Sequence, residues 1–235
     1  MAKSNNDERY FNFPIQLLKG FMIDEKEVLT NICDYAVYKK SLDLILGETE
    51  FENMKDSERY FGISLTSIDR SLKNGLSLYN NIPVNSPKVG LSKLMFFDFY
   101  KNDKSEFDKI CLLGFLAIKS ILGAKVYTKL DNKFWLSRMD GNPKSVKDYS
   151  ELSKEVRVFA NEYQTRKIKT ALRDNWGLVT YSRYTRGFYV SYSLTLEQLM
   201  YEAEKRRKST IEKQNKVQEK EALKRVLERI KNEQP

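Results

Sequence analysis

The strongest constraint on the fold is a change of hydrophobic period at Gly177. Before this glycine, Ile168, Ala171 and Leu172 recur at helical spacing, so one face of the segment can pack inward. Gly177 itself follows the last residue of the pattern and supplies the left-handed geometry with which many helices end. The sequence therefore predicts a helix over residues 165–176.

The residues after Gly177 have the composition of two short strands. Residues 178–183 and 188–194 are rich in β-branched and aromatic side chains. The link at 184–187 is short and ends in glycine, which suits a hairpin turn. We expect a β-hairpin over residues 178–194.

Positive charge is concentrated in this helix and hairpin. Residues 165–192 carry six cations against one acid, Asp174, which is more than half of the net charge of +9. A basic stretch of this kind favours a polyanionic partner, with nucleic acid ahead of an anionic membrane surface. Helical spacing places Arg166, Lys169, Thr170 and Arg173 on the face opposite the apolar one.

The run IKTALRDNWGLV resembles the end of the recognition helix and the first wing strand of a winged-helix DNA-binding domain, and the resemblance extends over residues 105–194. In that family the helix enters the major groove and the wing tip touches the backbone or the minor groove, so phosphate contacts position the protein and base contacts specify the sequence. The resemblance implies a role for seven residues. They are Lys169, Thr170 and Arg173 in the groove, Arg166 and Lys167 on backbone phosphates, and Arg183 and Arg186 at the wing.

The element order before the basic helix is also that of a winged-helix domain. Ser105 is expected to cap an apolar helix that reaches Gly123, residues 125–129 have strand character, and Asp131 is expected to cap a short helix closed by Gly141.

Residues 142–164 depart from the winged-helix pattern, whose turn before the recognition helix is usually a few residues. Two interpretations remain open: the segment is an insertion, or residues 151–161 form the second helix of the domain. The basic helix and the wing are the same in both.

The N-terminal third predicts helices. Residues 13–22 indicate a short helix, and Asp24 is expected to cap a longer one that ends before Gly47. Residues 57–79 hold a weaker helix-turn-helix pattern, for which DNA contact and plain helix packing are the alternatives. Pro, Asn and Gly at residues 80–90 indicate a domain boundary, and the aromatic stripe at 91–100 is expected to pack the two halves together.

From Thr195 the chain predicts one long charged helix. Leu196, Leu199, Met200 and Ala203 are spaced to dock on the body. The rest is either a frayed tail or a partner-binding helix, whose partner would be a second copy of the chain or a replication or transcription protein.

Composition excludes several functions. With no histidine, neither a Ser-His-Asp triad nor a His-ligated metal site can form within the chain. Cys33 and Cys111 lie in apolar helical patterns and are expected to be buried, reduced thiols of a cytoplasmic protein. No secretory or membrane segment, acidic metal cluster or nucleotide-binding glycine loop is evident, so we expect no enzyme, no cofactor and no bound metal.

The sequence thus predicts a mainly α fold with a small β-hairpin wing, of the α+β class. Its expected parts are a helical N-terminal domain at 1–82, a winged-helix domain at 91–194 and a charged C-terminal helix at 195–235. The expected function is non-enzymatic binding of duplex DNA, in replication initiation of the plasmid or phage type or in transcription regulation. The alternative is a protein-interaction or structural module that acts through the C-terminal helix without DNA.

Overall fold

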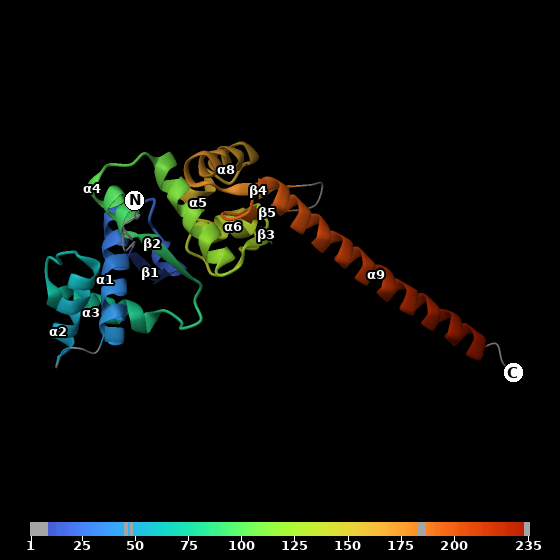
Figure 1. Cartoon of the computed structure of the whole chain (residues 1–235), viewed down its shortest axis with the longest axis horizontal. Helices are drawn as coiled ribbons and strands as arrows, with labels where there is room; N and C mark the ends of the chain where they lie inside the picture. The colour runs from blue at the N-terminus through green and yellow to red at the C-terminus, as the bar shows by residue number, and fades with distance from the viewer. Residues whose placement is uncertain (1–8, 45–46, 48, 183–186, 233–235) are drawn as a thin grey trace, which may run out of the picture.

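The computed structural model describes residues 9–44, 47, 49–182 and 187–232. It is mainly helical, with two small antiparallel sheets and a long C-terminal helix, which agrees with the α+β class expected from the sequence. Figure 1 shows a body of packed helices from which the C-terminal helix projects far beyond its neighbours.

The N-terminal part combines three helices with a two-stranded sheet. Its strands pair antiparallel, from Tyr10 opposite Ser92 to Pro14 opposite Lys88. The elements are β1 (Tyr10–Pro14), η1 (Ile15–Leu18), α1 (Glu25–Leu44), α2 (Glu50–Phe61), α3 (Ile68–Asn81) and β2 (Lys88–Ser92).

The prediction of a helix over residues 13–22 is wrong, because the chain forms β1 and then a single 3-10 turn, η1. Phe11 and Phe13 are fully buried while Tyr10 and Asn12 are exposed, which is the two-residue alternation of a strand.

Local signals place the three N-terminal helices. Asp24 accepts a hydrogen bond from the backbone N–H of Glu27 at 2.9 Å and so caps α1, as expected. Gly62 ends α2 at φ 58° in the left-handed region, and Ser67 caps α3. These residues confirm the helix, turn and helix predicted within 57–79, although α3 extends beyond this range to Asn81.

The second part begins with α4 (Lys93–Lys101) and α5 (Glu106–Leu122). Ser105 and Asp131 cap α5 and α6 as predicted, each by accepting from a backbone N–H three residues on. The further elements are β3 (Tyr127–Leu130), α6 (Asn132–Met139), η2 (Tyr149–Glu151), α7 (Lys154–Arg157), α8 (Glu162–Trp176), β4 (Val179–Tyr181) and β5 (Phe188–Ser191).

A three-stranded antiparallel sheet gathers the strands of this part in the order β3-β5-β4. The last strand in sequence therefore lies in the middle, between its hairpin partner and the strand that precedes α6. Leu130, Phe188 and Val190 are buried on one face of the sheet, where Phe188 meets Trp135 of α6.

The segment between α6 and α8 contains only one turn of α-helix. The helix expected over residues 151–161 is reduced to α7, and η2 precedes it. Asp140 holds the segment to the end of α6, because its carboxylate accepts from Ser153 Oγ at 2.6 Å and from the Ser153 backbone N–H at 2.9 Å. Residues 151–161 therefore do not form the complete helix that the second interpretation requires.

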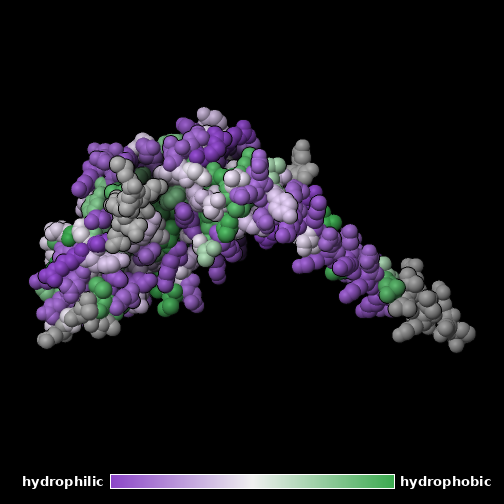
Figure 2. Space-filling model, viewed as in Figure 1, coloured by the Kyte–Doolittle hydropathy of each residue, from purple (hydrophilic) through white to green (hydrophobic). Residues whose placement is uncertain are grey.

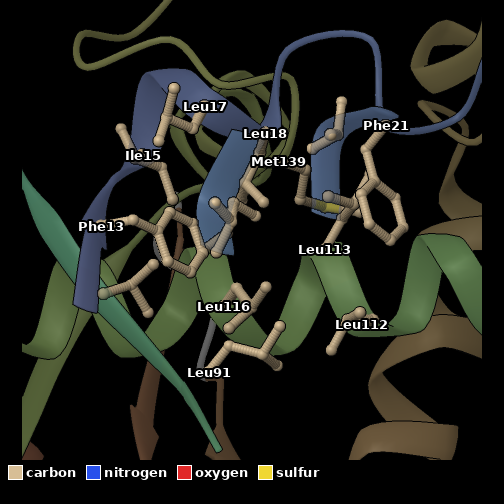
Figure 3. Close-up of a cluster of buried hydrophobic side chains, with 14 of the residues drawn as sticks. Phe13, Ile15, Leu17, Leu18, Phe21, Leu91, Leu112, Leu113, Leu116 and Met139 are labelled. Carbon is tan, nitrogen blue, oxygen red and sulfur yellow. The ribbon is translucent and has the colours of Figure 1, made fainter. Parts of the chain in front are cut away.

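One hydrophobic core runs through both parts of the body (Figure 3). Phe13, Ile15 and Leu18 from the N-terminal part point toward Leu113 and Leu116 of α5. Residues 88–90, which the sequence assigns to a boundary segment, instead form part of β2. The segment after α3 therefore connects two parts that share a core.

The final helix, α9 (Leu196–Asn232), docks on the sheet by its first turns only. Leu199 and Ala203 are buried as predicted, whereas Leu196 and Met200 are exposed. Tyr127 donates a hydrogen bond to Glu202 at 3.3 Å and Tyr181 donates one to Glu204 at 3.0 Å. Because Tyr127 and Tyr181 lie on the sheet face opposite Val190, α9 and the α5–α8 core sandwich the sheet.

Cys33 and Cys111 are both buried and unpaired, in agreement with the sequence. Among the described residues, no helix has the length and apolar content required to cross a bilayer.

Candidate nucleic-acid interface

Helix α8 is anchored on the body by a narrow buried face. Asn161 caps it, and Thr165, Ile168 and Leu172 are buried, the last two completely. At the crossing with α5, a Cβ on Gly114 would lie only 3.3 Å from Ile168 Cγ2, so the small residue allows α8 to approach closely. This packing fixes which side chains of α8 face outward.

The outward face of α8 carries a line of exposed polar side chains. Arg166, Lys167, Thr170 and Arg173 are exposed, as predicted for four of the seven proposed DNA contacts. They recur at three- and four-residue spacing, so they share one side of the helix over about two turns. In the space-filling view the surface over α8 is predominantly hydrophilic (Figure 2).

Both arginines of this face have nearby carboxylates. Arg166 pairs with Glu162 at 2.7 Å and Arg173 pairs with Asp174 at 2.9 Å. All four side chains are more than half exposed, and exposed ion pairs contribute little to stability. A phosphate group can therefore replace either carboxylate at small cost. The pairs also hold the two guanidinium groups on the outer surface.

Lys167 lies at the side of the outward face that is next to α5. Its ammonium sits 4.5 Å from the centre of the Phe107 ring. This cation–π contact restricts the orientation of the Lys167 side chain. A restricted side chain suits a contact with one backbone phosphate better than a contact that moves along a DNA groove.

Lys169 is the clearest correction to the expected site. The sequence assigns it to the exposed face, but it is half-buried between α8, α6 and the sheet. Its ammonium lies 3.6 Å from the centre of the Phe188 ring and donates to Asn132 Oδ1 at 2.9 Å. Burial and, to a smaller extent, the charge of Arg166 together lower its pKa to about 8. Lys169 therefore supports the packing of α8 and does not face outward.

The hairpin that follows α8 is described except for its tip. Arg183 and Arg186, the two predicted wing contacts, lie outside the described residues. Gly187 precedes β5, the second strand of the hairpin, and has a φ of 94°. A Cβ at this position would lie 2.6 Å from the carbonyl oxygen of Leu130. Glycine is thus required where the hairpin closes against β3.

Tyr163 is an outward residue that the sequence-based site omits. It is 70% exposed in the first turn of α8 and precedes Arg166 and Thr170 by three and seven residues. That spacing could have identified it, since it continues the same helical face.

The helix-turn-helix of α2 and α3 has a different electrostatic setting. Arg70 and Lys73 are exposed on α3, but they line a surface depression together with Asp24, Glu27 and Asp34 of the α1 segment. Acids thus outnumber cations beside α3, and Asp34 is additionally held by a 2.8 Å hydrogen bond from Asn74.

Two features of the described residues concern acidic clusters and thiols. No group of three or more Cys, Asp or Glu side chains within them could hold a metal ion. A cavity of about 290 Å³ between α1, α3 and α4 contains Cys33, but burial raises the pKa of this thiol to about 12, so it stays protonated and is a poor nucleophile.

Comparison with known proteins adds no assignment: neither protein-family models, nor curated proteins, nor solved structures yield a match to this chain.

Proposed function

We propose that the protein is a non-enzymatic duplex-DNA-binding protein that reads DNA with α8 and steadies it with the β4–β5 hairpin. The topology supports this proposal. The order α5, β3, α6, α8, β4, β5 is the element order implied by the winged-helix resemblance, with η2 and α7 between α6 and α8.

The observation that carries the proposal is the division of α8 into two faces. Ile168 and Leu172 fix the helix on α5, while Arg166, Thr170 and Arg173 project on the other side. An α-helix fits the major groove of B-DNA, where arginine can bind guanine with two hydrogen bonds. In this proposal Arg173 and Thr170 read bases, and Arg166 and Lys167 bind phosphates.

The surroundings of α3 favour a protein in which a single helix reads DNA, which we call one reading head. A second head would need a helix whose outer surface attracts phosphates, but Asp24, Glu27 and Asp34 lie beside Arg70 and Lys73. A chain with one reading head resembles transcription regulators more than the two-headed replication initiators of plasmids and phages. We therefore favour regulation of transcription as the role.

The salt dependence of DNA binding tests this proposal. With a random-sequence duplex of about three helical turns, the affinity should fall linearly on a log–log plot, with a slope near −0.9 for each phosphate neutralised. Fluorescence anisotropy between roughly 50 and 200 mM salt measures this slope. An affinity that does not change over that range would overturn the proposal.

A second candidate rests on α9. This helix has 37 residues and is exposed from Lys205 to Arg225, which also fits a protein-interaction module that reaches a partner without DNA. The two candidates differ at low salt, where only the first requires binding to duplex DNA.

A further inference from the structure

The part of α9 beyond the body carries positive charge on one side. Lys205, Ser209, Lys213, Lys216, Lys220 and Lys224 follow one another at intervals of three or four residues and are all exposed. At about 100° per residue these six positions, with Arg206, lie within an arc of roughly 100°. We call the lysines of this set, with Arg206, the α9 stripe.

Three acids occur between Lys205 and Lys224, and all of them lie outside the stripe. Glu212 and Glu219 project to one side of it and Glu221 to the other, at helical positions that no stripe residue shares. Within the part of the chain that the structure describes, Lys205, Lys213, Lys216 and Lys220 form no ion pair. Lys224, at the far end of the stripe, pairs with Glu228 at 3.9 Å. The stripe thus contains a row of four lysines, from Lys205 to Lys220, that are free to bind an anion.

The body does not cover the stripe. The last hydrogen bond from the sheet to α9 reaches Glu204, and the side chains that follow it are exposed to residue 225. Figure 1 shows α9 leaving the sheet beside β4 and pointing away from the rest of the chain. The arm is largely hydrophilic on the side that Figure 2 shows. Its exposed Ile211, Val217 and Leu223 lie about 120° apart around the helix, so they do not form the continuous apolar face that a helix lying in a membrane surface needs.

We propose that the α9 stripe is a second binding element for the sugar-phosphate backbone of duplex DNA, outside the segment that α8 contacts. Residues 205–220 extend about 24 Å along the helix at 1.5 Å per residue. That length matches roughly seven base pairs at 3.4 Å each. Cations at regular spacing along a straight helix complement the regular charge of a duplex, and contacts with backbone phosphates do not depend on the base sequence.

This inference rests on the proposed DNA-binding function, so its test must separate the two. The decisive variant of the full chain is Lys213→Gln/Gln214→Lys/Asn215→Lys/Lys216→Asn. It keeps composition, net charge and helical propensity but moves two lysines out of the stripe by about 100° each. Circular dichroism checks that the variant keeps the helix content of the parent protein.

The probe is a random-sequence duplex of about 40 base pairs, which is long enough to span both elements. The stripe account predicts weaker binding at low salt and a salt slope smaller in magnitude by about 1.8, because two lysines each lose a phosphate contact worth ~0.9. Binding and slope equal to those of the parent would overturn the inference, since charge would then act without regard to its position.

Two further outcomes separate the hypotheses. If Arg173→Ala weakens binding while the rearranged arm does not, the stripe inference fails and the proposed function stands. If the parent does not bind the duplex even at low salt, both fail, and binding of the arm to an acidic protein becomes the account to test.

Discussion

Helices α3 and α8 are two versions of the same local design with different surroundings. Each follows a shorter helix and a turn, and each is held on its part of the core by a close helix crossing. However, Arg166 and Arg173 of α8 pair with exposed acids of their own helix, whereas Arg70 and Lys73 of α3 line a depression with acids of the neighbouring α1 segment. The comparison teaches that a helix-turn-helix pattern alone does not identify a DNA-reading helix. The charge of the neighbouring element contributes to the electrostatic potential at the helix surface and so affects how strongly that surface attracts a phosphate.

The largest expected effect concerns the anchor of α8. Leu172 is fully buried, so Leu172→Ala should lower the free energy of unfolding by about 2–5 kcal/mol, through lost burial and the cavity that remains. Urea denaturation measures this change. The matched control is Thr170→Ala on the exposed face of the same helix, which should change stability little. Similar effects for the two variants would show that α8 is not packed as described.

The corresponding anchor of α3 is Gly75. A Cβ at this position would lie 2.5 Å from Tyr38 Cβ and 2.7 Å from the carbonyl oxygen of Asp34. Gly75→Ala should therefore push α3 away from α1 and lower the free energy of unfolding by roughly 1–3 kcal/mol, despite the better helix propensity of alanine. DNA affinity measured under folded conditions should stay at the parental value. A large loss of affinity would contradict the assignment of reading to α8 alone.

Lys169 sharpens the comparison through its pH dependence. Its pKa of about 8 in the folded protein lies below the ordinary lysine value near 10.4, so between these values the unfolded chain binds more protons. This group therefore makes stability rise as pH rises from about 8 toward 10. In Lys169→Met that contribution is absent, so the stability of the parent relative to the variant should increase with pH over this window. Chemical denaturation at several pH values measures the trend, and a constant difference would mean that Lys169 is solvated.

Much of the fold follows from local signals in the sequence. Asp24, Ser105, Asp131 and Gly177 mark helix ends because capping depends on residues within one turn. The strand β1 was missed because its partner, β2, lies more than seventy residues away and no local signal records that pairing. The one-turn α7 was overestimated for a related reason, since hydrogen bonds from Ser153 to Asp140 hold its segment in place of helix packing.

The exposed and buried faces of α8 were predicted in outline, with one error of placement. Helical periodicity correctly separates Ile168 and Leu172 from Arg166 and Arg173. It fails for Lys169, which lies at the edge of the buried arc, because the ring of Phe188 that covers it belongs to a strand further along the chain. A helical pattern shows which residues share a face, but tertiary packing determines how wide the buried face is.

The central claim is that α8, and not α3, reads DNA. The most direct measurement compares Arg173→Ala with Arg70→Ala, which remove one exposed arginine from each helix. Duplexes are first selected from a random pool with the parent protein, and each variant is then titrated with a selected and a random duplex. The account predicts that Arg173→Ala loses ~1–3 kcal/mol of discrimination, the typical value of one bidentate base contact, while Arg70→Ala behaves like the parent. Loss of discrimination in Arg70→Ala, with Arg173→Ala unchanged, would contradict it.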